Sequence, residues 1–146
     1  SVWEKCSPEQ LDNLALLRVM ECTNGVIQHA YRDSADFALP IEETRTAMQF
    51  SMGAIKRLTI PLGDREIKFE GWMADELRHA RDLYIQGIKY GNAEAQEEFF
   101  ECSQATVDAV GRERLRKAVD ILNEHCSHAF PNGTPMWGYE YLSGWL

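Results

Sequence analysis

Residues 7–22 read SPEQLDNLALLRVMEC, and this stretch carries the clearest helix signal in the chain. Ser7 is suited to cap a helix, Pro8 suits the first helical position, and Gln10 completes a capping box with Ser7. Apolar residues then recur at helical spacing: Leu11, Leu14, Leu17, Val19 and Met20. The pattern predicts a helix from Pro8 to about Cys22.

The end of this first helix is open on the sequence alone. Residues 23–25 (Thr-Asn-Gly) are typical of a helix terminus, whereas the apolar residues between Val26 and Tyr31 continue the helical periodicity. In either case the polar run from Arg32 to Asp36 is predicted to be a loop.

Four further helices are expected from the periodicity of apolar residues and from capping signals. The second begins near Pro40, the third runs from Trp72 or Ala74 to Tyr90, the fourth is capped by Asn92, and the fifth ends at Cys126. The second helix is expected to place one set of residues on a single apolar face: Ile41, Thr44, Met48, Met52, Ile55 and Leu58 or Thr59. The third helix is expected to bury Met73, Leu77, Ala80, Leu83 or Tyr84, and Ile88.

A short hairpin is predicted near residues 59–70, because the apolar spacing there changes to an alternation around Gly63-Asp64. Pro61 restricts the first segment to an edge strand or an irregular loop. After the fifth helix, the chain is expected to be an irregular tail rich in aromatic residues, and Asn132-Gly133-Thr134 has the form of a glycosylation acceptor.

These elements predict a mainly all-α fold in which about five helices form one disulfide-linked bundle. The 146 residues suit a single domain spanning residues 1–146. Hydrophobic residues make up 45% of the chain and charged residues 26%, which is typical of a globular protein and too apolar for a disordered one.

The four cysteines are Cys6, Cys22, Cys102 and Cys126. Their even number, wide spacing and lack of a C-x-x-C pair are typical of structural disulfides and not of zinc or redox sites. Together with the start of the chain at Ser1, without an initiator Met, the four cysteines predict a secreted protein from which a signal peptide has been removed.

Helix geometry limits how these cysteines pair. In a straight helix over residues 8–22, Cys22 lies about 20 Å along the axis from Cys6. A disulfide needs Cα atoms within about 7 Å, so the Cys6–Cys22 pair is disfavoured. The remaining pairings join the N-terminal helix to the fourth and fifth helices, and the residues do not decide between the two crossed patterns.

The charge balance argues against nucleic acids and anionic membranes as partners. The chain has 15 Lys and Arg residues against 23 Asp and Glu residues, a formal net charge of −8. Phosphate binding needs a basic face. The dense basic run at 112–117 is interpreted as part of one helix whose charge complements that of the neighbouring helix, and not as a phosphate site. No apolar run approaches the roughly 20 residues of a membrane span.

The motifs that resemble catalytic or metal sites are incomplete. Glu76-Leu77-Arg78-His79 is a single E-x-x-H motif, whereas a di-iron helical bundle needs two. His125 and His128 flank Cys126, but an oxidised Cys126 cannot be a thiolate ligand. The chain has no nucleophile elbow, phosphate-binding loop or H-E-x-x-H motif. We therefore expect neither enzymatic activity nor a metal or other cofactor.

Two kinds of binding function remain. In the first, the protein encloses a small apolar or amphipathic molecule between its helices, as flexible methionines and aromatic rings allow. The residues expected to line that ligand are Met48, Met52, Trp72, Phe99, Trp137 and Tyr141. In the second, the protein is an inhibitor or effector that binds another protein through its acidic surface or its aromatic C-terminal tail. The sequence does not separate the two.

A short helical chain with few cysteines and an aromatic tail resembles, in general type, the odorant-binding-type and salivary proteins that arthropods secrete. The resemblance implies an extracellular helical binding protein. The odorant-binding pattern has two cysteines three residues apart, and this sequence has no such pair. No residue role is therefore carried over from that family.

Overall fold

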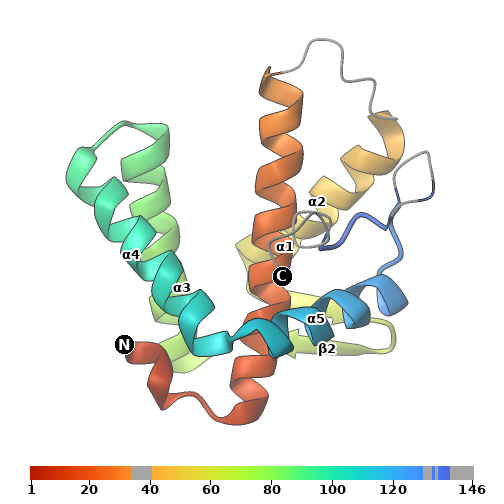
Figure 1. Ribbon diagram of the computed structural model, residues 1–146, viewed down its shortest axis with the longest axis horizontal. Coiled ribbons are helices and arrows are strands. Elements are labelled where there is room, and N and C mark those ends of the chain that lie inside the picture. The colour runs from red at the N-terminus through yellow and green to blue at the C-terminus, as the bar shows by residue number, and fades with distance from the viewer. Residues whose placement is uncertain (34–40, 130–132, 134, 139–146) are drawn as a thin grey trace.

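The computed structural model describes residues 1–33, 41–129, 133 and 135–138, and for residues 26–33 and 41–44 it describes the backbone alone. The described elements, in chain order (Figure 1), are the 3-10 helix η1 (Val2–Lys5), α1 (Pro8–Asp33), α2 (Ile41–Arg57), β1 (Thr59–Leu62), β2 (Arg65–Lys68), α3 (Gly71–Tyr84), the π-helix η2 (Ile85–Lys89), α4 (Ala93–Val110) and α5 (Arg112–His125). The prediction of a mainly helical fold with five α-helices and a short hairpin is confirmed. No helix in the described ranges combines the length and hydropathy needed to cross a membrane.

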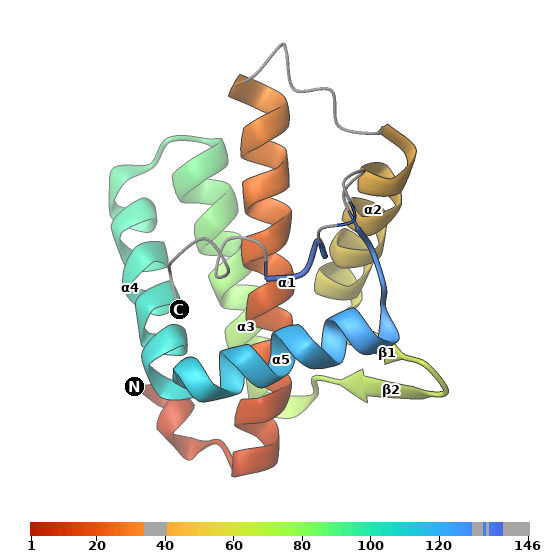
Figure 2. The same cartoon turned by 45° about the vertical axis from the view of Figure 1, so that its right-hand side comes forward.

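Helix α1 is the central element of the fold, as Figures 1 and 2 show. Helices α2, α4 and α5 all pack against it. Between Leu14 and Met20, every residue except Arg18 is at most 3% exposed. Because these residues point in all directions around the helix, α1 is enclosed by protein on every side along these two turns.

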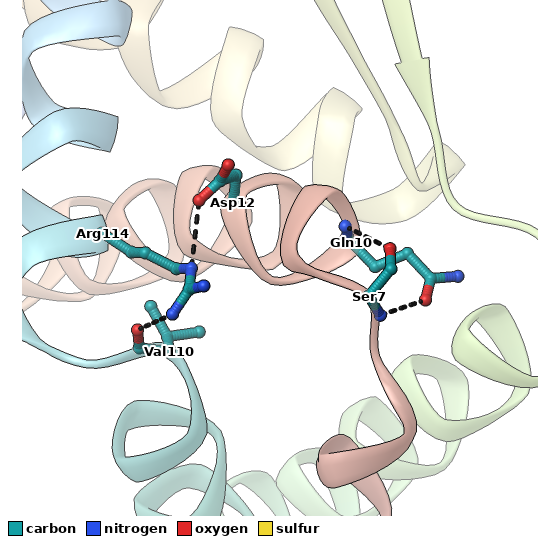
Figure 3. Close-up of polar contacts among 5 residues, drawn as sticks. All are labelled: Ser7, Gln10, Asp12, Val110 and Arg114. Atoms are coloured by element: carbon teal, nitrogen blue, oxygen red, sulfur yellow. Dashed lines mark hydrogen bonds and ion pairs between the residues drawn. The ribbon is translucent and has the colours of Figure 1, made fainter.

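The start of α1 has the predicted capping box. The backbone N–H of Ser7 donates to Gln10 Oε1 at 2.8 Å, and the N–H of Gln10 donates to Ser7 Oγ at 3.1 Å (Figure 3). The two bonds satisfy backbone donors that a helix start leaves without partners. The sequence therefore sets the first residue of the central helix.

Helix α1 continues to Asp33, so the predicted loop at Arg32–Asp36 is wrong for its first two residues. Thr23 and Asn24, which favour helix ends in isolation, are buried in the middle of this helix. The Thr23 hydroxyl accepts a hydrogen bond from the backbone N–H of Gly138 at 3.3 Å. Tertiary packing at these positions outweighs the penalty of about 1 kcal/mol that Gly25 brings to a helix interior.

Helix α2 buries part of the predicted face, since Leu58 directly after it is buried and Ile55 and Met48 are partly buried, whereas Met52 is not. Ala47, Ser51 and Ala54 are at most 1% exposed, whereas Met52 is 51% exposed. The three buried residues are small and share one face at helical spacing, so the backbone of α2 can lie close to its neighbours. The larger side chain of Met52 is thereby turned to solvent.

Strands β1 and β2 form the predicted antiparallel hairpin. Thr59 pairs with Lys68 and Leu62 pairs with Arg65, which leaves Gly63-Asp64 as a two-residue turn. Gly63 has a φ of +62°, a conformation that glycine adopts without strain. The hairpin residues buried in the core are Ile60, Leu62 and Ile67.

Residues 135–138 of the C-terminal tail fold back over the helices. Trp137 is 0% exposed, and its indole N–H donates to the backbone carbonyl of Cys126 at 2.6 Å. The side-chain amide of Asn123 donates to the carbonyl of Trp137 at 3.2 Å. This part of the tail is therefore a component of the core. Tyr141 and Asn132 lie outside the described residues.

The predicted disulfide links between the helices are not seen. The described residues include all four cysteines, and no disulfide joins them in this structure. Cys126 is buried at the end of α5, whereas Cys6, Cys22 and Cys102 are partly exposed. The helical part of the fold prediction is confirmed, and the disulfide framework stays a prediction.

Replacing Trp137 by Ala is expected to lower the free energy of unfolding by about 3–5 kcal/mol, because the change leaves a large cavity and removes the indole hydrogen bond. Urea denaturation measures this loss. Met52→Ala removes an exposed apolar side chain instead, and its effect should stay within about 0.5 kcal/mol. Equal effects of the two substitutions would contradict the burial of Trp137.

Candidate functional site

Two of the residues predicted to line a ligand site lie far apart along the α3–α4 pair. Trp72, at the start of α3, packs against Trp3 with ring centroids 6.0 Å apart. Phe99, on α4, contacts Tyr84 with ring centroids 5.4 Å apart. Tyr84 lies about 18 Å from Trp72 along α3, at the usual helical rise. Trp72 and Phe99 therefore do not line one site.

Three other predicted lining residues are associated with α2. Met48 packs in a small cluster with Ala47 and Met136. Trp137, which follows Met136, contacts Phe50 of α2 with ring centroids 6.0 Å apart. Met48 and Trp137 thus belong to one region, whereas Met52 faces solvent. The described members of the predicted set therefore lie at separate places on the fold.

Helices α3 and α4, joined through η2, form a helical hairpin at one side of the molecule, coloured green to teal in Figures 1 and 2. Gly87 of η2 is buried, and a Cβ at this position would lie 2.5 Å from the backbone N of Gln96. The backbones of η2 and α4 are therefore in direct contact. The predicted cap of α4 is confirmed, since Asn92 Oδ1 accepts from the N–H of Ala95 at 3.1 Å.

Large apolar side chains gather on the outer half of this hairpin, in a group we call the hairpin patch: Tyr84, Ile88, Tyr90, Phe99 and Phe100. Tyr90 is 68% exposed and Phe100 is 54% exposed, and Tyr84 and Ile88 are also exposed. Phe99 connects Tyr84 and Phe100, because its ring centroid lies 5.4 Å from that of Tyr84 and 5.7 Å from that of Phe100. Among the residues whose side chains the structure describes, Met52 is the one exposed large apolar residue outside this hairpin.

Negative charge borders the hairpin patch. Helix α4 contains no Lys or Arg. Its outer half exposes four glutamates: Glu94, Glu97, Glu98 and Glu101. Glu98 lies 3.5 Å from His79 of α3, and the Lys89 ammonium lies 5.7 Å from the centre of the Tyr90 ring. The surface therefore combines aromatic rings with an acidic border.

The sequence reasoning assigned part of this patch to the core. It placed Tyr84 or its neighbour Leu83, together with Ile88, on the buried stripe of the third helix. In the structure Leu83 is buried, and Tyr84 and Ile88 are exposed. The sequence did contain one signal of an exposed aromatic ring. The adjacent residues Phe99 and Phe100 point about 100° apart on a helix, so they cannot both lie on one narrow buried stripe.

Ionisable side chains of α1, α3 and α4 meet near the middle of the hairpin. Arg18 Nη1 lies 3.7 Å from Glu21 Oε2. Burial raises the pKa of the Glu21 carboxyl, and the charge of Arg18 opposes this effect. Burial also raises the pKa of the Cys102 thiol, with further increases from the carboxylates of Glu76 and Glu21. These shifts place Cys102 within electrostatic range of the Arg18–Glu21 pair.

The residues around Cys126 serve the packing of the tail. The Cys126 thiol points to the carbonyl of Pro61 at 3.6 Å, and burial raises the pKa of the thiol. His128 Nδ1 lies 2.7 Å from the carbonyl of Cys126, and its ring contacts Trp137 with centroids 5.6 Å apart. A thiol with a raised pKa is a weak nucleophile at neutral pH.

Comparison with known proteins supplies no relative from which a function can be carried over. No protein-family model matches the chain, and no curated protein or solved structure matches it. The function is therefore argued from the hairpin patch and its surroundings.

Gly87→Ala is expected to destabilise the hairpin by about 1–3 kcal/mol, because the added methyl group meets backbone atoms that cannot rotate away. The free energy of unfolding measures this effect. Gly25→Ala is the matched control, since nothing lies within 4 Å of a Cβ there. That change in a helix interior should increase stability, by up to about 1 kcal/mol. Equal changes in the free energy of unfolding for Gly87→Ala and Gly25→Ala would contradict the backbone contact between η2 and α4.

Glu21→Gln is expected to change how stability depends on pH. The pKa of Glu21 is raised above its ordinary value of 4.5, so the folded state favours the protonated carboxyl. The stability that this group contributes is complete below the unfolded-state pKa and is lost as the pH rises through the folded-state pKa. The stability of the Gln variant relative to the wild type should therefore increase with pH above 4.5. Denaturation at a series of pH values measures this difference in stability. Glu97→Gln, at an exposed position, is the control. Parallel stability profiles for the wild type and Glu21→Gln would contradict a raised pKa for Glu21.

Proposed function

We propose that the protein is a secreted, non-enzymatic binding protein that contacts another protein through the hairpin patch. The exposure of the aromatic rings of Tyr84, Tyr90 and Phe100 on one hairpin carries this proposal. Contiguous apolar patches with polar borders are typical of protein interfaces, and aromatic residues are enriched at the centres of such interfaces. The four cysteines support the extracellular setting.

The hairpin holds the rings of Tyr84 and Phe100 in defined positions. The backbone contact at Gly87 and the Asn92 cap hold α4 against α3 and η2. The mutual ring contacts of Tyr84, Phe99 and Phe100 restrict their rotamers. A surface ordered before binding loses less conformational entropy when a partner docks, which favours affinity.

The charges around the patch indicate a basic partner. The four exposed glutamates of α4 lie beside the aromatic rings, and the whole chain carries a net charge of −8. A surface with apolar side chains flanked by Lys or Arg complements this arrangement, and opposite charges increase the association rate and the specificity. A second copy of this chain is disfavoured as the partner, because its own glutamates would face these glutamates.

A carrier that encloses a small molecule has less support. That function needs its lining residues to converge, whereas Trp72, Phe99 and Met48 lie on different parts of the fold. We therefore favour the binding of another protein over the enclosure of a small ligand.

The double substitution Tyr84→Ser with Phe100→Ser tests the hairpin patch. The probe is a synthetic amphipathic helical peptide with Leu on one face and Lys on the other, and calorimetric titration measures its dissociation constant. The wild type is expected to bind this peptide, with weaker binding at high salt because charge contributes. The double variant should bind about 10-fold more weakly or worse, since it lacks two aromatic anchors.

Two controls make the test specific. Met52→Ser removes an exposed apolar side chain outside the patch and should leave the dissociation constant unchanged. A peptide with Glu in place of Lys should not bind. Equal binding of the Lys peptide by the wild type and the double variant would overturn the proposal.

A further inference from the structure

The end of α4 is fixed beside the second turn of α1 by one guanidinium group. Arg114 Nε donates to Asp12 Oδ1 at 3.1 Å, and Arg114 Nη1 donates to the carbonyl of Val110 at 3.4 Å (Figure 3). Arg114 lies in the first turn of α5, directly after the chain leaves α4. This contact sets the register between α1 and α4.

From this contact the two helices bring Cys22 and Cys102 to nearly the same level. Helices α1 and α4 run antiparallel and pack against each other (Figures 1 and 2). Cys22 lies about 15 Å beyond Asp12 along α1, and Cys102 lies about 12 Å before Val110 along α4, at the usual helical rise. The two thiols are therefore offset by about one helical half-turn along the axis.

Cys22 lies on the same side of α1 as two residues whose charges act on Cys102. Arg18, Glu21 and Cys22 share one side of α1, at i, i+3 and i+4 spacing. The charges of Glu21 and Arg18 both act on the pKa of the Cys102 thiol, after the larger effects of burial and of the Glu76 carboxylate. A disulfide needs the two Cα atoms within about 7 Å, so a bridge between these cysteines requires α4 to lie close to α1 at the level of Cys102.

The fold separates Cys6 from Cys22, and it places Cys126 far from the start of α5. The unbroken helix α1 carries Cys22 about 20 Å from Cys6. Helix α5 starts next to Asp12 and carries Cys126 about 18 Å away from that point, where its thiol faces Pro61. Cys6 lies six residues before Asp12, beside which α5 starts, whereas Cys126 lies at the end of α5.

We propose that Cys22 and Cys102 form a disulfide that ties the α3–α4 hairpin to the central helix, while Cys6 and Cys126 stay as thiols. This inference goes beyond the proposed function and selects one bridge from the pairings that the sequence left open. The bridge links the middle of α4 to α1 and fixes the hairpin that presents the aromatic patch.

The oxidant is a small disulfide of the oxidised glutathione class. The thiolate of one cysteine attacks a sulfur of the oxidant, forms a mixed disulfide and releases one thiol. The thiolate of the second cysteine then attacks the protein sulfur of that mixed disulfide and releases the second thiol. The two cysteines lose two hydrogens in total, and one oxidant disulfide is reduced to two thiols.

Disulfide mapping of the full chain tests the proposal. The reduced protein is treated with oxidised glutathione under native conditions, alkylated in denaturant, digested and examined by mass spectrometry. The expected products are a linked peptide pair that contains Cys22 and Cys102, and alkylated peptides that contain Cys6 and Cys126. A bridge that includes Cys6 or Cys126, or alkylation of all four cysteines, would overturn the proposal.

Variants separate this bridge from the binding function. Cys22→Ser and Cys102→Ser should each abolish the linked pair, whereas Cys6→Ser combined with Cys126→Ser should retain it. Oxidation should also raise the melting temperature of the wild type by several degrees and leave that of Cys22→Ser unchanged. No binding partner takes part in these measurements, so a failure of the hairpin patch would not alter their result.

Discussion

The burial of α1 on every side is the constraint on which the rest of the structure depends. Two turns of this helix, from Leu14 to Met20, lie in the core, with Arg18 as the one exception. Burial of such side chains contributes about 1.5–3 kcal/mol each, so every neighbouring element gains by packing against this segment. Helices α2, α4 and α5 do so, and residues 135–138 add a further contact through Thr23.

The same arrangement leaves large apolar side chains on the outer half of the α3–α4 hairpin exposed. Arg114 joins the end of α4 to α1, whereas Phe100 and Tyr90, near the other end of the hairpin, are exposed. The hairpin is nevertheless ordered by its own contacts, above all the close approach of Gly87 to α4. Aromatic rings on a rigid, acidic projection are suited to a protein partner, and this combination is the basis of the proposed function.

The features that the sequence predicted correctly depend on neighbouring residues. The Ser7–Gln10 capping box, the turn at Gly63 and the Asn92 cap each involve residues within a few positions of one another, so short motifs identify them. The burial of Trp137 and the exposure of Tyr84 depend on which distant elements meet. Helical periodicity shows that a face is apolar, but it does not show which neighbour covers that face.

The central claim is that the hairpin patch is the binding surface. Its most direct test is a titration of isotope-labelled protein with the Leu–Lys peptide, in which two-dimensional NMR spectra report shifts of individual backbone amides. The account predicts that the shifts concentrate at residues 84–101 and that the amides of α2 and of residues 135–138 stay in place. Shifts centred on α2 and residues 135–138 would contradict the account and would place the binding surface around Met48 and Trp137.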